Sequence, residues 1–158
     1  MYSLSMVNVP NELSGYFTAS DFEQYPKVAI PQSFSDERGN IINIADGSLG
    51  DVAIIQSNAH STRANHIHDS DWHLSYCLLG SLNYSYEETT GKVYTVFIQA
   101  GDLFFTPVGV PHRMDFLQET LLVVVSRNSR RKDNYEHDTK KYFVNSEATN
   151  KKNATDLS

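Results

Sequence analysis

The sequence is poor in cysteine, in long apolar runs and in positive charge. Its one cysteine, Cys77, cannot form a disulfide within the chain, so nothing requires an oxidising compartment. The longest apolar run, residues 121–125, is too short to span a bilayer, and the first residues lack the pattern of a signal peptide. We therefore expect a cytoplasmic protein with no membrane partner.

The charge balance is acidic, with 13 Lys and Arg against 19 Asp and Glu and a formal net charge of -6. An acidic surface repels phosphate backbones, so we expect no nucleic-acid partner. The balance still allows one phosphorylated small molecule to be held by a local arginine. The length of 158 residues fits a single domain, which buries about two-thirds of its unfolded surface.

Aromatic residues are plentiful, with nine Tyr and eight Phe, and aromatic side chains favour strands. From residue 41 onward, short apolar segments alternate with turn signals, and no stretch has a sustained helical period. This pattern is typical of an all-β sandwich or barrel. The expected strands are residues 41–44, 52–56, 64–68, 74–79, 82–87, 92–99, 103–106, 112–116 and 121–126.

The two ends of the chain differ from this central region. Ser20 and Glu23 have the spacing of a capping box, which predicts a short helical turn. Pro26 and Pro31 confine residues 27–30 to an edge strand or an extended arm. The last residues are hydrophilic and predict a frayed tail. We therefore divide the chain into an N-terminal arm (1–26), a β domain (27–143) and a flexible polar tail (144–158).

Four of the six histidines fall in two clusters. His66 and His68 are two residues apart on a predicted strand, so both side chains point to the same face. His73 follows a polar turn, and His112 follows a segment rich in Gly and Pro. Histidine is the commonest metal ligand. A lone histidine on a strand is more often hydrogen-bonded or exposed than a metal ligand. The Gly and Pro residues spaced around the four histidines are therefore needed to decide whether they form a metal site.

That framework resembles the cupin family. The first cupin motif has His-x-His, three or four residues, Glu, six residues and Gly, and His66, His68, His73 and Gly80 have this spacing. His73 replaces the Glu, and Ser61 or a neighbour stands where the motif opens with Gly. The second motif is matched without a gap by Gly101, Pro107, Gly109 and His112, with Phe116 in place of its final Asn. The resemblance implies a single antiparallel β-barrel, the cupin jelly roll, with its ligands pointing inward.

The resemblance also implies a metal site. With an imidazole in place of the carboxylate, a divalent transition metal such as Zn, Fe or Ni suits the site better than Mg or Ca. The predicted ligands are His66, His68, His73 and His112. Two alternatives stay open: His73 hydrogen-bonds nearby while three histidines bind the metal, or no metal binds. Three carboxylates either orient the histidines or form turns, namely Asp69, Asp71 and Asp102.

Strand alternation adds a prediction about the residues around His73. If His73 faces inward, so do Ser75 and Cys77. Cys77 then lies beneath the metal or is a small core residue. The residues expected on the opposite face are Trp72, Leu74 and Tyr76.

A second resemblance is to the rhamnose epimerase-like group of cupins, which act on nucleotide-linked 4-keto-6-deoxy sugars. Residues 30–40, the segment 63–66 and residues 124–139 are similar to the opening, the Arg-Gly-x-His segment and the closing segment of that group. This implies epimerisation or keto-isomerisation by proton transfer next to a carbonyl. The resemblance makes His66 the base, Arg63 the partner of the diphosphate or carbonyl, and a tyrosine the acid. Tyr76, which stands about where the group has a lysine, is the third candidate catalytic residue. The candidate substrate-binding residues are Arg63, Trp72, Tyr84, Tyr86, Phe105 and Arg113.

If His66 ligates a metal, it cannot also be the base. The base is then a metal-bound hydroxide or another side chain, or the metal acts as a Lewis acid. An Fe(II)-type dioxygenase or another small-molecule metalloenzyme is the alternative, and a non-catalytic ligand-binding cupin is a third. Cupins of the epimerase-like group usually pair through N-terminal strands, so we expect a homodimer through residues 27–30.

Overall fold

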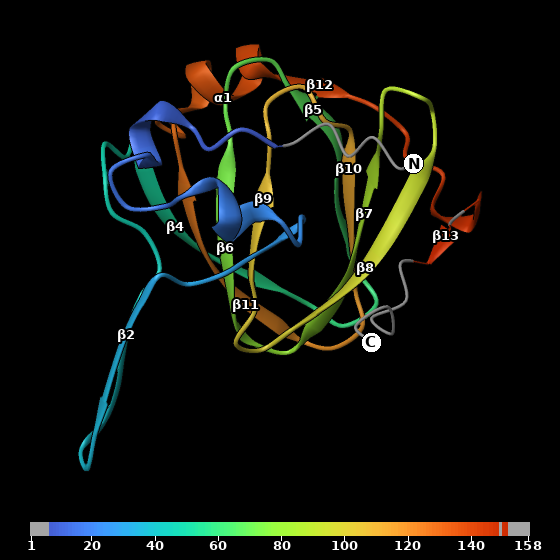
Figure 1. The fold of residues 1–158 in the computed structure, drawn as a ribbon. Helices are drawn as coiled ribbons and strands as arrows, with labels where there is room; N and C mark the ends of the chain where they lie inside the picture. The colour runs from blue at the N-terminus through green and yellow to red at the C-terminus, as the bar shows by residue number, and fades with distance from the viewer. Residues whose placement is uncertain (1–6, 149, 152–158) are drawn as a thin grey trace.

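The structure is a computed structural model that describes residues 7–148 and 150–151. Two β-sheets face each other and enclose the core (Figure 1). The five-stranded sheet is antiparallel, and its strands are ordered β1 (Lys27–Val28), β9 (Leu103–Thr106), β6 (His73–Leu79), β11 (Thr120–Ser126) and β4 (Asp51–Ser57).

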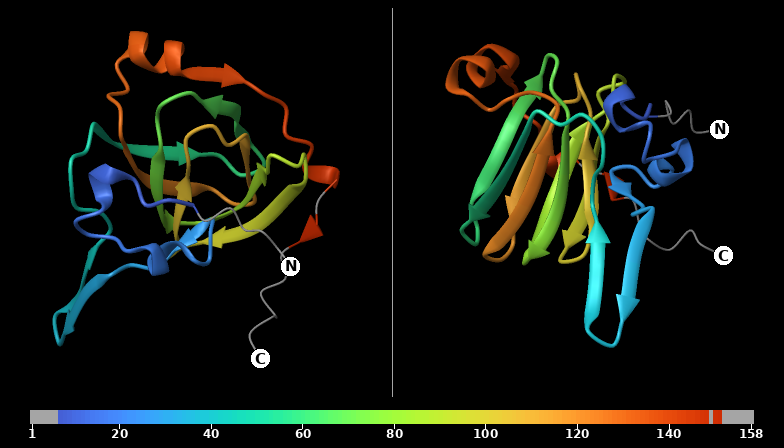
Figure 2. Two further views of the ribbon diagram at one scale, coloured as in Figure 1. Left: turned by 45° about the horizontal axis from the view of Figure 1, so that its top comes forward. Right: turned by 90° about the vertical axis from the view of Figure 1, so that its left-hand side faces the viewer.

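The second sheet has six strands, ordered β12 (Thr139–Lys141), β5 (Thr62–His68), β10 (His112–Phe116), β7 (Ser81–Glu87), β8 (Val93–Gln99) and β13 (Asn150–Lys151). Among the described strands of this sheet, only β13 and β8 pair in parallel. A separate hairpin of β2 (Gln32–Asp36) and β3 (Gly39–Asn43) projects from the body (Figures 1 and 2). The all-β jelly-roll class predicted from the sequence is confirmed, although the two sheets do not close into one barrel.

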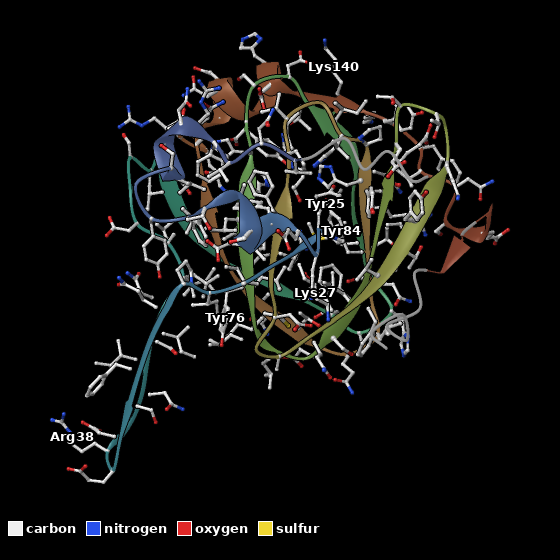
Figure 3. The ribbon with its side chains drawn as sticks, viewed as in Figure 1. Tyr25, Lys27, Arg38, Tyr76, Tyr84 and Lys140 are labelled. Atoms are coloured by element: carbon white, nitrogen blue, oxygen red, sulfur yellow. The ribbon has the colours of Figure 1, made fainter. Side chains whose placement is uncertain are left out.

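The main core lies between the two sheets. Because side chains alternate along a strand, every second residue of β7 and β10 points into this space. Tyr84 is fully buried there, and Figure 3 shows it between the sheets. Cys77 is also part of this core. The other buried members are Tyr25, Leu82, Tyr86, Ile98, Phe104, Met114, Phe116, Leu122 and Val124.

A second core covers the outer face of the five-stranded sheet. The N-terminal segment crosses this face with two 3-10 helices, η1 (Asn11–Leu13) and η2 (Ala19–Phe22). Phe22 packs edge-on against Phe105 with ring centroids 5.2 Å apart. The residues buried in this second core are Leu13, Phe17, Phe22, Val28, Trp72, Leu74, Leu103, Phe105 and Val125.

All nine predicted strands are present, with ends shifted by a few residues at most. The structure also corrects the sequence reading in several places. β2 was missed because Phe34 alternates with serines and gives no apolar run. The helix α1 (Lys132–Asp138) was not predicted, since it lacks an apolar stripe. The capping box belongs to Thr18 and Asp21 instead of Ser20 and Glu23, with the Thr18 amide 2.7 Å from the Asp21 carboxylate.

The ends of the chain are described only in part. The region predicted as a frayed tail contains η3 (Ser146–Ala148) and the short strand β13. Residues 1–6, 149 and 152–158, which belong to the predicted arm and tail, lie outside the described residues. Within the part of the chain that is described, no helix has the length and hydropathy needed to cross a membrane.

Candidate metal centre and ligand cavity

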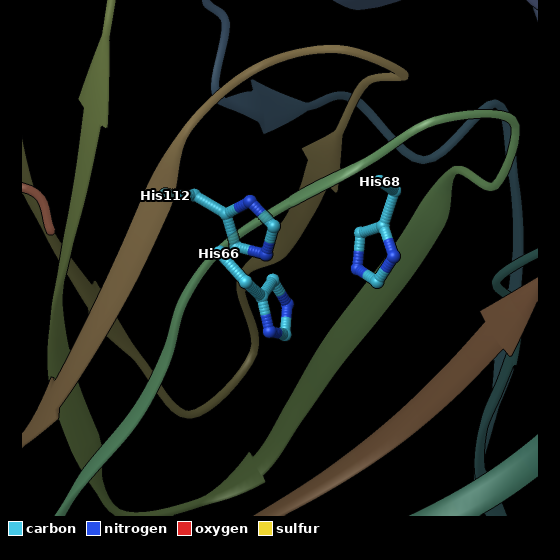
Figure 4. Close-up of side chains that lie close together, drawn as sticks. All are labelled: His66, His68 and His112. Carbon is cyan, nitrogen blue, oxygen red and sulfur yellow. The ribbon is translucent and has the colours of Figure 1, made fainter. Parts of the chain in front are cut away.

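Three histidines meet between neighbouring strands of the six-stranded sheet. His66 and His68 lie on β5, and His112 lies opposite His66 on β10. The ring centroids of His66 and His68 are 4.6 Å apart, and those of His66 and His112 are 4.7 Å apart. One ring nitrogen from each histidine lies within 4.8 Å of the other two. Figure 4 shows the three rings converging on a common point.

The backbone leading into this cluster is strained. Ala64 and Asn65 have φ angles of 67° and 55°, in the left-handed region that disfavours side chains with a Cβ. The pairing with β10 skips Asn65, since His112 pairs with His66 and Arg113 pairs with Ala64. Asn65 is therefore the extra residue of a bulge, and bulges re-aim side chains next to functional sites.

Hydrogen bonds fix which ring nitrogens face the cluster. His112 Nδ1 is 2.9 Å from the carbonyl oxygen of Val110, which can only accept, so Nδ1 carries the proton. His68 Nδ1 is 3.1 Å from Oδ2 of Asp138. The Nε2 atoms of His68 and His112 are buried and have no hydrogen-bond partner among the described residues. A buried unpartnered nitrogen costs about 1–3 kcal/mol, and a cation bound to the lone pairs would remove this cost.

The histidines are also held in the neutral form that ligation requires. Burial, with the neighbouring imidazoles, lowers the pKa of His66 to about 3. The same causes lower the pKa of His68 to about 4. Burial lowers the pKa of His112 well below its usual value. The cluster can therefore hold a metal ion near neutral pH, and orientation of ligating histidines by a carboxylate and a carbonyl is typical of metal sites.

His73 lies beside these three histidines in an adjoining cluster. Its ring centroid is 4.4 Å from that of His68, and its Nε2 is 3.0 Å from Oδ2 of Asp71. Oδ1 of Asp71 accepts from the backbone amide of Asn128 at 2.9 Å. Among the described residues, His73 groups with His68 and Asp71, and not with the His66–His68–His112 triad. The structure thus brings three of the four predicted ligands into one group.

A cavity of about 330 Å³ adjoins the histidines. Apolar side chains form one part of its wall, and polar and charged side chains form the rest. Its lining includes Ile55, Arg63, His66, His73, Ser75, His112, Met114, Leu122, Val124, Arg130 and Tyr135.

Of the remaining predicted site residues on the six-stranded sheet, one lines this cavity and the others have different surroundings. Arg63 lines it, and its guanidinium donates to Ser57 Oγ at 2.8 Å and to the Gln56 carbonyl at 3.0 Å. Arg113 alternates with His112 and is ion-paired with Asp115 at 2.8 Å. Tyr84 is fully buried, with its ring centroid 6.1 Å from that of His112 and its hydroxyl 3.0 Å from Thr106 Oγ1. Tyr86 lines a different cavity, of about 320 Å³.

The structure does not bring Trp72, Tyr76 and Phe105 to the histidines. All three belong to the core on the outer face of the five-stranded sheet, where Tyr76 is partly buried. The alternation predicted around His73 is borne out: Ser75 lines the cavity and Cys77 lies in the inner core. The outer-face residues are therefore packing residues.

Sequence reasoning gave no individual role to three residues that the structure brings to the site. Asp138, at the end of α1, orients His68 from 70 residues away in the chain. Tyr135 on the same helix has its ring 6.3 Å from that of His68, and Arg130 lines the cavity. The signal that pointed to them was the resemblance of residues 124–139 to an epimerase closing segment. Of the predicted orienting carboxylates, Asp71 bonds to His73, whereas Asp69 and Asp102 pair with lysines that Figure 3 labels, Lys140 and Lys27.

The sequence and the fold of this chain were compared with those of known proteins. Residues 49–119 match the family model of the AraC-like ligand-binding domain. No curated protein matches the chain significantly in sequence. Among solved structures, the chain is similar to a 3,4-ketoisomerase of Thermoanaerobacterium thermosaccharolyticum, a double mutant bound to TDP. The identity is 20% and the TM-score 0.57, over 69% of this chain and 81% of that one.

Two further structures show the same fold. The rmlC epimerase of Mycobacterium tuberculosis is 13% identical with a TM-score of 0.60, over 75% of this chain and 70% of that one. A variant of oxalate decarboxylase from Bacillus subtilis is 20% identical with a TM-score of 0.50. That match covers 57% of this chain but only 23% of the decarboxylase. At these identities the likeness concerns the fold alone.

Proposed function

We propose that the chain is a metal-binding cupin that acts as an isomerase or epimerase on a keto-sugar carried by a nucleotide. The observation that carries this proposal is the pair of buried, unpartnered Nε2 atoms of His68 and His112 beside His66. The fold similarity to a ketoisomerase and an epimerase supports the choice of reaction class.

In this proposal His66, His68 and His112 hold one divalent transition metal, of which Zn, Fe and Ni suit imidazole ligands. When bound, the metal supplies Lewis-acid stabilisation to an oxygen that gains negative charge. Asp138 and the Val110 carbonyl keep the two ligating rings in the tautomer that leaves Nε2 free.

His73 is the proposed base, because His66 is engaged as a ligand. Its Nε2 bonds to Asp71, which leaves Nδ1 to take a proton from a substrate in the cavity that His73 lines. Asp71 orients the ring and stabilises the imidazolium that forms. Tyr135, on the same cavity wall, takes the role of proton donor that Tyr76 cannot fill from the outer face. Arg63, anchored by Ser57, offers its remaining N–H groups to the diphosphate.

Hydrogen–deuterium exchange tests this function. Nucleotide-linked keto-sugars that carry either a 6-deoxy group or a ring carboxylate are incubated separately with metal-loaded protein in D₂O, and proton NMR follows the positions next to the ketone. We expect enzyme-dependent exchange that falls at least about 100-fold in His73→Ala, within the usual range for a general base. The control is His60→Asn, at an exposed histidine with a φ of 64° that asparagine tolerates. No exchange above the uncatalysed rate would refute the proposed reaction.

One observation favours a second candidate, a small-molecule metalloenzyme of the dioxygenase type. The triad offers three protein ligands, and three-histidine sites with open positions can activate oxygen. The polar wall formed by Arg63, Ser75 and Arg130 is unlike the apolar pocket expected for that chemistry. Oxygen uptake by the Fe(II)-loaded protein with a candidate substrate would favour this reading. The third candidate, a non-catalytic ligand-binding cupin, rests on the match to a ligand-binding domain model.

We also propose that the protein is a homodimer. β1 pairs with β9 of its own chain, so it is not an unpaired strand that could be exchanged between subunits. A different surface, the apolar side chains of the projecting hairpin, is exposed and could form the dimer contact. Phe34 and Ile41 are 54% and 67% exposed there, and Ile54 on the outer face of β4 is 72% exposed. An isolated two-stranded hairpin is only marginally stable alone, so a second copy that covers these residues would stabilise it. Sedimentation should show a dimer that Phe34→Ser combined with Ile41→Ser converts to monomer, and a wild-type monomer would exclude it.

A further inference from the structure

We propose that Arg130 forms an anion subsite inside the histidine cavity, and that the substrate held there bears a carboxylate on its sugar ring. This inference deepens the proposed function and rests on it, because it names the class of keto-sugar: a sugar acid. Arg130 lines the same cavity as His66, His73 and His112.

The arginines near the site differ in how their donors are used. Arg63 donates to Ser57 and the Gln56 carbonyl, and Arg113 is paired with Asp115. Arg127 is paired with Glu12 and donates to the Ser70 carbonyl. Only in Arg130 are two guanidinium nitrogens, Nε and Nη2, both buried and without a hydrogen-bond partner among the described residues. Buried charged donors without an acceptor are costly, so this edge is the one that a ligand would satisfy.

Asp51 is the ion-pair partner of Arg130, but the contact with its side chain is not a hydrogen bond. Its Oδ2 accepts from the Arg130 backbone amide at 3.4 Å, and its Oδ1 lies 3.5 Å from Nε without forming a hydrogen bond. Nε–H and the adjacent Nη2–H point in parallel from one edge of the guanidinium plane. That edge matches the two oxygens of a carboxylate, which gives a bidentate pair.

Other polar atoms around the cavity also lack partners. Ser75 Oγ and His112 Nε2 are both buried, and neither has a hydrogen-bond partner within residues 7–148 and 150–151. A polyhydroxylated acid supplies a group to each of these: a carboxylate for Arg130, a hydroxyl for Ser75 and a carbonyl or hydroxyl oxygen near the histidines.

The size of the cavity favours a carboxylate over a phosphate as the partner of Arg130. The volume of about 330 Å³ is at the lower end of the range for ligand pockets, roughly 300–1,000 Å³. Such a cavity holds a single sugar ring, so the nucleotide and its diphosphate stay at the mouth. The buried edge of Arg130 then meets a group carried by the ring itself.

Three probes that differ in one group test this inference: glucuronate, glucose and glucose 1-phosphate. Their binding to the metal-loaded protein is measured by calorimetry or ligand-observed NMR. We expect glucuronate to bind at least tenfold more tightly than either of the others. Arg130→Gln should abolish this preference, Arg130→Lys should keep part of it, and the control Arg38→Gln, at an exposed arginine of the projecting hairpin, should leave it unchanged.

Each other outcome overturns the inference. Equal binding of the three probes, or no detectable binding, would show that the cavity does not select a carboxylate. Preferential binding of glucose 1-phosphate that is lost in Arg130→Gln would make Arg130 a phosphate ligand. A thermal melt and the metal content of Arg130→Gln verify that the fold and the metal site are intact. The preference for glucuronate is measured on the wild-type protein, so the result does not depend on whether a variant folds. It is also independent of the proton-exchange assay, which tests the reaction.

Discussion

The two faces of β6 separate the chemistry of this protein from its stability. On the inner face, His73 and Ser75 line a cavity, and several polar atoms of its lining have no hydrogen-bond partner in the described part of the chain. On the outer face, Leu74 lies in an apolar core formed with the N-terminal segment. Alternate residues of one strand therefore serve different ends, and substitutions on the two faces should have different consequences.

The largest expected effect on stability comes from the outer face. Leu74 is fully buried, and Leu74→Ala should lower the free energy of unfolding by about 2–5 kcal/mol. Chemical denaturation measures the loss, and the metal content of the folded protein should be unchanged. The control is Leu78→Ala on the same strand, where the side chain is 54% exposed and the change should stay within about 0.5 kcal/mol. Loss of metal from folded Leu74→Ala would break the separation between the two faces.

On the inner side, removal of the carboxylate that orients His68 should act on the metal and not on the fold. Asp138→Asn is expected to weaken metal binding about 10–100-fold, since its carboxylate fixes the tautomer of His68. Competition with a chelator of known affinity measures the change. Asp69→Asn is the matched control, because the Asp69 carboxylate pairs with Lys140 and forms no hydrogen bond with a histidine among the described residues. Equal weakening in both variants would indicate a general electrostatic effect in place of a specific one.

The smallest expected change in stability concerns backbone strain at Ala64, beside the histidine cluster. Ala64 has a φ of 67°, a conformation that costs a residue with a Cβ about 1–2 kcal/mol. Ala64→Gly should therefore be neutral or stabilise the protein by up to about 1 kcal/mol, since glycine also makes the unfolded chain more flexible. Thermal unfolding measures this difference. Ala53→Gly, within β4 and without a positive φ, should instead be destabilising, and a similar loss at Ala64 would argue against backbone strain.

The sequence predicted the strands and the histidines because both depend on local pattern. The two-residue spacing of His66 and His68 and the Pro-x-Gly segment before His112 are visible without the structure. The alternation around His73 also predicted that Trp72 and Tyr76 face away, and the structure bears this out. Their candidacy as substrate-binding and catalytic residues followed from residue type and the family resemblance, without regard to this alternation.

The rest of the site could not be predicted because it depends on contacts between distant segments. Asp138 reaches His68 because β12 pairs with β5, and no local pattern encodes that pairing. α1 has no apolar stripe, so its helical form was not evident. The unused donors of Arg130 are recognisable only when the partners of the other arginines are known.

The most direct test of the account is the metal content of the protein, measured by elemental mass spectrometry after purification without added metal or chelator. We predict close to one Zn, Fe or Ni per chain, lost when His68→Ala and His112→Ala are combined and retained in His60→Asn. Well-folded wild-type protein that contains no transition metal, and takes none up on addition, would contradict the central claim. His66 would then be free to act as the base of an epimerase-like pocket.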